Sequence, residues 1–299
     1  MQSNCTYLSY QQTGYFSKLV TDYITGDKKL EPLYKHAANI TGIQNSIEER
    51  KKFPQQRSIL VQELIKQYKG VEISAAAENN IQWLLDENTF TVTTAHQPNI
   101  FTGPLFFVYK ILHAIQLAGT LQKQLPAYKF VPVYYMGSED ADFDELNNIT
   151  ICGQRYEWHT KQTGAVGRMK VDKSFTALLH ALHGQLGVLP FGEEIMEAYK
   201  KFYTEGTLVQ DATLQLVNHL FGKYGLVVLI PDNAELKKVF RPVVEKELRE
   251  GFSYSAVLET IAVLDEHYKV QAAGRELNLF YLTNDQRLRI EKKEDGFFV

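Results

Sequence analysis

Two short polar segments carry the residue types that chemistry on small polar substrates requires. The first, HQPNIFTGP, begins at His96, and the second, GSEDADFDE, begins at Gly137. Imidazole and carboxylate groups can take a proton from an attacking amine, and carboxylates can also hold an amine in place. Amide, hydroxyl and glycine residues beside them suit hydrogen bonding or close backbone approach to a ligand. We therefore expect a site at these segments.

The candidates divide into two roles. The residues expected to be catalytic are His96, Asp140 and Asp142. The residues expected to bind substrate or nucleotide are their neighbours and a pair that follows a later apolar run, namely Gln97, Asn99, Thr102, Gly103, Gly137, Ser138, Glu139, Asp232 and Asn233. No metal site is expected, because Glu145 and Ile151 replace the glycine and the closing acidic ligand of a calcium loop.

A purely structural interpretation stays open for each group. His96 could be a hydrogen-bonded loop residue. In the acidic segment, Ser138 or Asp142 could cap a helix that starts near Phe143. Asp232 and Asn233 could form a turn and a helix cap after Pro231. The first loop matches neither GxGxxG nor GxxxxGK[ST], so the motif alone supports no ordinary nucleotide-binding assignment.

The elements around these segments predict an α/β fold with a parallel sheet. Strand-like runs at 91–95, 130–136 and 226–230 each precede a candidate segment. Because ligands bind at the carboxyl edge of such sheets, the two polar loops should lie side by side there. Pro104 suits the first position of a helix and Gly103 its cap, so a helix N-terminus would favour an anionic group. The apolar pattern of that helix indicates burial on most sides, and Pro132 argues for an edge or a bulge.

The expected organisation is a core with insertions. Residues 1–150 and 205–267 would form a Rossmann-like core with a helical N-terminal segment, 151–204 a connective insertion, and 268–299 the start of an antiparallel β insertion. Within the insertion, short strands are expected at 149–159, folded at Gly153–Gln154, and at 168–172, before three helical pieces between 175 and 222.

Composition limits the function classes. The chain has 299 residues, a net charge of −3 and a pI near 6.3. It offers no broad basic field for nucleic acid, and its apolar runs are too short to cross a membrane. Only Cys5 and Cys152 are present, which disfavours a disulfide scaffold and a zinc site. We expect a cytosolic protein whose partners are small molecules.

Several stretches resemble one family over essentially the whole chain. HQPNIFTGPLFFVYKILHAIQLA, FVPVYYMGSEDADFDELNNI, KYGLVVLIPDN and NLFYLTNDQRLRIE occur in the order found in the bacillithiol biosynthesis cysteine-adding enzyme (BshC) family. The resemblance implies a Rossmann-like core similar to class I aminoacyl-tRNA synthetases, with connective insertions. It implies a ligase joining cysteine to the amine of glucosaminyl-malate, with ATP as a possible cofactor, and a coiled-coil homodimer for a full-length form only.

The chain departs from the family pattern at three points. Ala141 stands where many members have a histidine, and Asn99 stands where a synthetase-like HxxH signature would have its second histidine. The chain is also considerably shorter than family members. These departures keep two alternatives open. One is another class-I-like nucleotide-dependent ligase or nucleotidyltransferase acting on a small amine, and the other is a non-catalytic ligand-binding relative.

Overall fold

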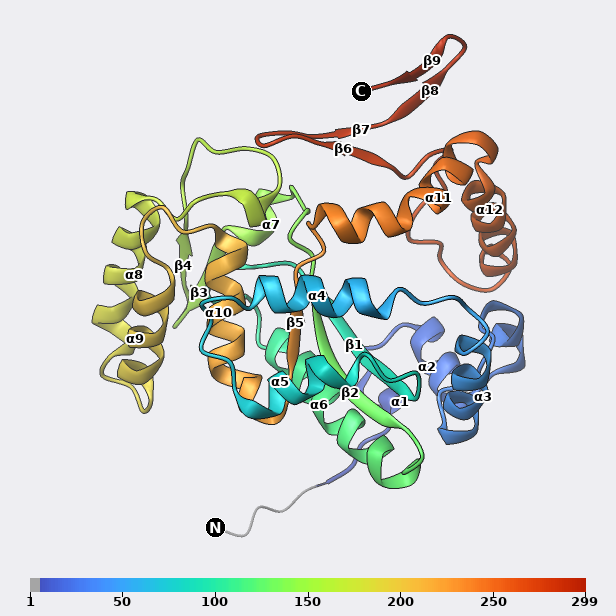
Figure 1. Ribbon diagram of the computed structural model, residues 1–299, viewed down its shortest axis with the longest axis horizontal. Helices are drawn as coiled ribbons and strands as arrows, with labels where there is room; N and C mark the ends of the chain where they lie inside the picture. Colours follow the sequence, from blue (N-terminus) through green and yellow to red (C-terminus); the bar gives the residue numbers. More distant parts are fainter. Residues whose placement is uncertain (1–5) are drawn as a thin grey trace. The chain divides into compact units, whose positions relative to one another are not determined.

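The computed structural model describes residues 6–299, so Cys5 lies outside the described residues. The chain divides into two compact units (Figure 1). The first comprises the chain up to Pro54 together with Val244–Asn278, and the second comprises Gln55–Val243 with Leu279–Val299. The division expected from the sequence, into a core and two insertions, stays a prediction.

The first unit is helical. Its elements are α1 (Tyr10–Thr13), α2 (Lys18–Thr25), η1 (Lys28–Leu33), α3 (Ile40–Arg50), the end of α11 (Ala234–Glu250) and α12 (Phe252–Asp265). Within it, the hydroxyl of Tyr268 donates to Asp22 at 2.9 Å. The helical N-terminal segment that the sequence predicts is broken after α3. Residues 46–68 form the end of α3 and then α4 (Arg57–Gln67), with Pro54 between them because proline lacks the N–H that a continuous helix needs.

A three-stranded parallel sheet lies at the centre of the second unit. Its strands are β1 (Thr89–His96), β2 (Lys129–Met136) and β5 (Val227–Leu229), in the order β1-β2-β5. The expected α/β class and all three strands are confirmed. β2 is the central strand, yet Pro132 itself pairs only with Val92 of β1, because the pairing of β2 with β5 begins one residue later, at Val133. Pro132 is therefore not at a fully paired position, as its missing N–H predicts.

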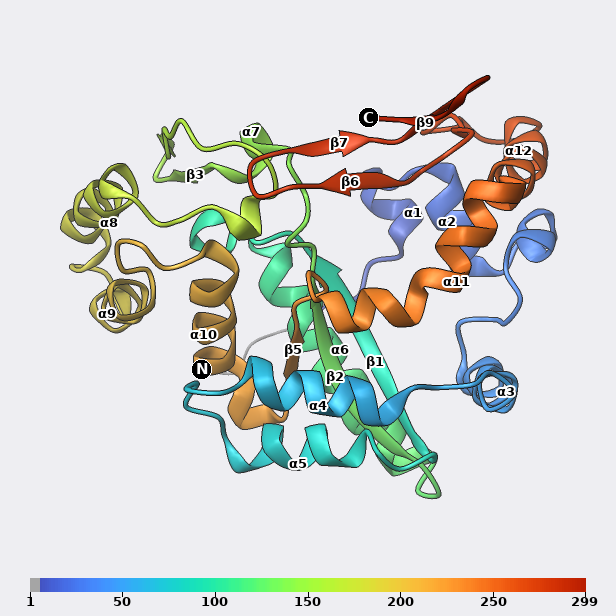
Figure 2. The ribbon, with the colours of Figure 1, turned by 45° about the horizontal axis from the view of Figure 1, so that its top comes forward.

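Helix α6 (Phe106–Gln124) connects β1 to β2 and packs on the sheet. Its buried stripe consists of Phe107, Ile111, Ala114, Ala118 and Leu121. Val108 and Ile115 are partly buried against the same core, whereas Leu112 is exposed, so the burial on most sides that the apolar pattern predicts is found only in part. Figure 2 shows α6 behind the strands and α4 in front of them.

The free edge of β5 is closed by side chains from α4 and its C-terminal cap. Gln67 donates to the carbonyl of Val228 at 2.8 Å and accepts from the N–H of Ile230 at 2.9 Å. The hydroxyl of Tyr68 accepts from the N–H of Val228 at 2.7 Å. These bonds replace a neighbouring strand, so the backbone groups of a buried edge stay satisfied.

The segment between β2 and β5 builds a second hydrophobic core. Its elements are α7 (Phe143–Leu146), β3 (Asn148–Ile151), β4 (Gln154–Glu157), η3 (Val166–Arg168), α8 (Lys173–Leu186), α9 (Gly192–Phe202), α10 (Val209–Phe221) and η4 (Gly222–Tyr224). Helix α5 (Ala75–Trp83) lies outside this segment, before β1. The hairpin and the three helices confirm the expectation. The hairpin turns at Cys152–Gly153, one residue earlier than expected, and both residues have positive φ. Cys152 is exposed there.

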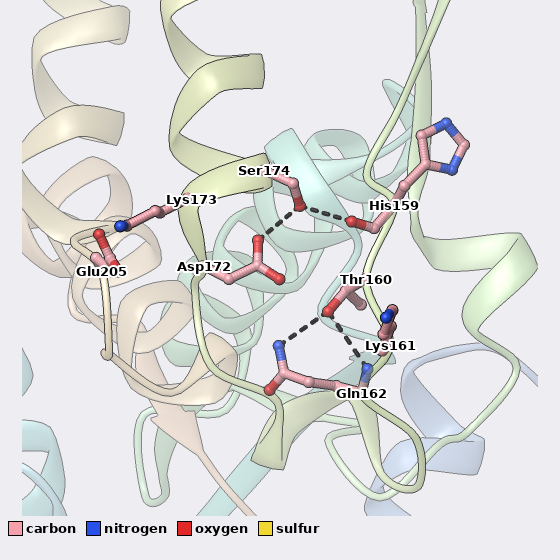
Figure 3. A pocket seen from close by; sticks show the side chains of 8 residues that line it. All are labelled: His159, Thr160, Lys161, Gln162, Asp172, Lys173, Ser174 and Glu205. Atoms are coloured by element: carbon pink, nitrogen blue, oxygen red, sulfur yellow. Dashed lines mark hydrogen bonds between the residues drawn. The ribbon is translucent and has the colours of Figure 1, made fainter.

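The strand expected at 168–172 is wrong. Only Lys170 makes an isolated bridge, to Leu208, and Asp172 caps α8 by accepting from the N–H of Phe175 at 3.0 Å. Because Asp172 bonds to the backbone as a helix cap, this role competes with the extension of a strand through its position. Asp172 and Ser174 line an open cavity of about 800 Å³. Figure 3 shows these two side chains at its wall.

Residues 280–298 form two separate antiparallel hairpins. They are β6 (Phe280–Leu282) with β7 (Arg287–Arg289), and β8 (Glu291–Lys293) with β9 (Gly296–Phe298). The first hairpin turn lies against the insertion, where the hydroxyl of Thr163 donates to the carbonyl of Asp285 at 2.8 Å. The C-terminal hairpins are thereby attached to the insertion of the same unit.

Candidate active site

The two polar loops meet at the carboxyl edge of the sheet. The N–H of Gly137 donates to the carbonyl of His96 at 2.8 Å, and Nε2 of Gln97 donates to Oδ2 of Asp140 at 3.1 Å. The register pairs His96 with Met136, so both loops leave the sheet at the same level (Figure 2). The expectation that these loops lie side by side is confirmed.

The first loop has an unusual backbone. Phe101, Thr102 and Gly103 are three consecutive residues with positive φ, at 53°, 63° and 63°. Left-handed conformations of non-glycine residues are strained and persist only where packing enforces them. Here the buried ring of Phe101 stacks on Phe175, with ring centroids 5.4 Å apart. Packing from the insertion therefore holds the loop in shape.

Gly103 is needed in this loop, although it is not the helix cap that the sequence suggested. A Cβ at this position would lie 2.7 Å from the Cβ of Asn99. Helix α6 begins at Phe106 instead of Pro104, with Leu105 as its N-cap and no side chain capping it. The left-handed run and the turn from Pro104 to Phe107 take up the residues that would have formed the first turn.

His96 is half-buried between two aromatic rings. Its ring centroid lies 5.3 Å from that of Phe106 and 5.5 Å from that of Phe107. Burial lowers the pKa of His96, and the hydrogen bond to the Gln97 carbonyl offsets this only in part. Nδ1 lies 3.1 Å from the carbonyl oxygen of Gln97, which can only accept, so Nδ1 carries the proton. Nε2 then presents a lone pair, as a general base requires.

Some polar groups beside His96 are hydrogen-bonded within the protein, and one has no partner. Oδ1 of Asn99 is buried without a hydrogen-bond partner. The hydroxyl of Thr102 donates to the carbonyl of Phe101 at 2.6 Å, and Lys110 donates to the carbonyl of Ala95 at 2.6 Å. Thr102 and Lys110 therefore stabilise the loop and the strand end. Asn99 keeps an acceptor that a ligand donor could satisfy.

The acidic loop holds Asp140 firmly and leaves Asp142 exposed. Oδ1 of Asp140 accepts from the N–H groups of Ala141 and Asp142, at 2.8 and 3.3 Å. Asp142 precedes α7 as its N-cap residue, yet its side chain makes no capping bond. The alternative of a carboxylate cap by Asp142 is therefore not the arrangement found. Ser138 is buried and caps nothing either, since its hydroxyl has no partner.

A chain of alternating charges connects the acidic loop to the loop after β5. Lys237 on α11 contacts Glu139 and also donates to Oδ1 of Asp232 at 2.8 Å. Arg168 donates to both oxygens of Asp232, at 2.5 and 2.9 Å. Burial alone would raise the pKa of Asp232, but the bonds from Arg168 and Lys237 outweigh it and hold that pKa below its usual value. Asp232 is therefore a carboxylate in the site.

Asn233 serves mainly as a helix cap. Its Oδ1 accepts from the N–H groups of Glu235 and Leu236, at 2.9 and 3.0 Å, and its Nδ2 donates to Glu63 at 2.9 Å. The capping interpretation is thus confirmed for Asn233. Of the predicted pair after β5, only Asp232 joins the charged groups of the site.

Arg168 and Lys237 are the site residues that sequence reasoning missed. Arg168 lies 64 positions before Asp232 in the chain, so no local spacing pairs them. Lys237 follows Asn233 by one helical turn, and that position on a helix beginning at the carboxyl edge is the only available signal. Within residues 6–299, no group of three or more His, Cys, Asp or Glu residues could hold a metal ion.

Comparison with known proteins assigns the chain to a family. The family described as "Bacillithiol biosynthesis BshC, N-terminal Rossmann-like domain" matches residues 1–299. The chain belongs to the BshC family. Among its BshC relatives, a Flavobacterium psychrophilum protein is 43% identical over 302 residues and a Flavobacterium johnsoniae protein 40% identical over 301, each covering the whole chain. A Cytophaga hutchinsonii protein is 37% identical and covers 98% of the chain.

These BshC relatives are longer than the chain. Each carries the name "Putative cysteine ligase BshC", and the chain spans 56% of the length of the first two and 54% of the third. The family confirms the resemblance and the Rossmann-like fold expected from the sequence. In the part of the chain that the structure describes, no helix is long and apolar enough to cross a membrane.

Proposed function

We propose that this chain supplies the core of a cytosolic ligase that joins L-cysteine to the amine of glucosaminyl-malate, the last step in making bacillithiol. The observation that carries the proposal is the junction of the His96 loop with the acidic loop, in a chain of the BshC family. A base and several carboxylates at one sheet edge suit the joining of a carboxylate to an amine.

The proposed chemistry follows from the two demands of amide formation. The carboxylate must be activated, and the ammonium of the acceptor must lose a proton before it attacks. His96 is the proposed base, because its lowered pKa keeps the imidazole neutral near pH 7. Asp140 is fixed by Gln97 and the two backbone N–H groups, so it positions the acceptor amine, while exposed Asp142 adds attraction for a cation.

The first loop does not fit a nucleoside triphosphate by itself, because it offers no cation for the phosphates. Asn99 is a neutral amide, His96 is uncharged near pH 7, and Lys110, in the helix that follows, already donates to Ala95. The proposed steps therefore involve no ATP, and incubation with and without ATP tests whether it is required.

A second candidate within the same reaction class is another class-I-like nucleotide-dependent ligase whose acceptor is a different small amine. ATP-dependent release of pyrophosphate with other amine acceptors would identify such an enzyme. A non-catalytic relative would bind ligands without turnover.

The test uses the natural protein that contains this chain. It is incubated with L-cysteine and glucosaminyl-malate, with and without ATP, and bacillithiol is measured by mass spectrometry. We expect bacillithiol to accumulate in at least one condition. A folded protein that binds cysteine yet forms no bacillithiol in either condition would overturn the proposed ligase.

A further inference from the structure

The contact between Lys237 and Asp232 links two ion pairs, Glu139–Lys237 and Arg168–Asp232, that differ in their exposure to solvent. The side chain of Asp232 is 8% exposed, whereas the side chains of Glu139 and Lys237 are 33% and 44% exposed. Water screens an ion pair between part-exposed groups, so the Glu139–Lys237 pair contributes little to stability and can be exchanged for a ligand.

The Arg168–Asp232 pair is held by several hydrogen bonds. Arg168 donates one hydrogen bond to each carboxylate oxygen of Asp232 and also donates to the carbonyl of Thr283 at 2.7 Å. Bidentate guanidinium–carboxylate pairs of this kind are geometrically specific. Asp232 therefore stays in place when a ligand arrives and keeps Lys237 near the carboxyl edge.

We propose that Glu139 and Lys237 form the subsite for the α-amino acid, with its ammonium bound by Glu139 and its carboxylate by Lys237. This inference rests on the proposed function, and it assigns the amino acid to residues on two elements, the acidic loop and α11. The zwitterion opens the existing pair and gives each partner a new opposite charge.

The charge balance explains why a zwitterion fits. Glu139, Lys237, Asp232 and Arg168 carry formal charges that sum to zero. A ligand with only a carboxylate would leave Glu139 without a partner, and a ligand with only an ammonium would leave Lys237 to share Asp232 with Arg168. A ligand with both charges leaves neither unpaired. Glu139 also keeps the amino group of cysteine protonated, so that this group does not compete with the acceptor amine as nucleophile.

Calorimetric titration of the natural protein that contains this chain tests the subsite. The probes are L-cysteine, cysteamine, which lacks the carboxylate, and 3-mercaptopropionate, which lacks the ammonium. Cysteine should bind at least tenfold more tightly than either analogue. Glu139→Gln and Lys237→Met should each weaken cysteine binding at least tenfold. Lys238→Met is the matched control, since Lys238 pairs with Glu235 and should leave affinity within twofold.

The outcomes separate this inference from the proposed function. Equal binding of cysteine and both analogues would overturn the subsite, as would equal affinities of the Lys237 and Lys238 variants. If a variant fails to fold, the analogue series in the unmodified protein decides alone. If Glu139→Gln and Lys237→Met both form bacillithiol with an unchanged KM for cysteine, the ligase stands and the subsite is wrong. If L-serine binds tightly and this binding depends on Lys237, but no bacillithiol forms, the subsite stands and the proposed ligase is wrong.

Discussion

Gln97 and Asp140 are hydrogen-bonded across two loops, with Nε2 of Gln97 donating to Oδ2 of Asp140 at 3.1 Å. The bond joins the end of β1 to the end of β2, which the parallel register already places side by side. It orients the carboxylate toward the loop that carries His96. This contact makes one site of two segments whose bonded residues are 43 positions apart in the chain.

The strained first loop should depend on its glycine. Gly103→Ala places a Cβ against Asn99 at φ 63°, so we expect a loss of roughly 1–3 kcal/mol in unfolding free energy. Gly119→Ala is the control, because Gly119 lies in α6 with open space around it and should gain roughly 0.5–1 kcal/mol. Urea unfolding measures both. A Gly103→Ala protein as stable as the parent would mean that the loop is not strained.

The pKa of His96 should be observable by NMR. Because burial lowers this pKa, the midpoint of the His96 Cε1–H resonance should lie below the ordinary value of 6.5, with His96→Gln identifying the signal. Between the folded pKa and 6.5 the unfolded chain binds more protons, so His96 supports stability above pH 6.5 and this contribution is lost as the pH falls through the folded value. A midpoint at or above 6.5 would contradict the buried, neutral imidazole.

The Arg168–Asp232 pair should stabilise the second unit. Arg168→Met leaves a largely buried carboxylate with Lys237 alone, so we expect a loss of roughly 2 kcal/mol, less than for a fully buried pair because Arg168 is partly exposed. Arg155→Met provides the comparison, since its exposed pair with Glu157 should contribute less than about 0.5 kcal/mol. Similar unfolding free energies for the two variants would show that the Arg168–Asp232 pair does not stabilise the second unit.

The sequence predicted what depends on local pattern. The apolar run at 226–230 and the β-branched run at 91–95 became strands, and the polar loops behind two of the strands became neighbours, because parallel strands share a carboxyl edge. Asn233 was recognisable as a cap for the same local reason. These features need only near neighbours in the chain.

The sequence did not predict what depends on distant partners. Pro132 looked unsuitable for a central strand because the length of β5 was not visible from β2. Helix α6 starts late because Phe101 packs on Phe175, far along the chain. Arg168 and Lys237 became site residues only through tertiary pairing with Asp232. Packing and long-range charge pairs decided each of these features.

The central claim is that the His96 loop and the acidic loop form one catalytic site, and product formation by variants of the natural protein that contains this chain tests it most directly. His96→Ala and Asp140→Asn should each lower bacillithiol formation by a factor of roughly 100 or more, with little change in melting temperature. His113→Ala, at an exposed position of α6, should retain full activity. Full bacillithiol formation by both His96→Ala and Asp140→Asn would contradict the claim and leave the two loops as structural elements.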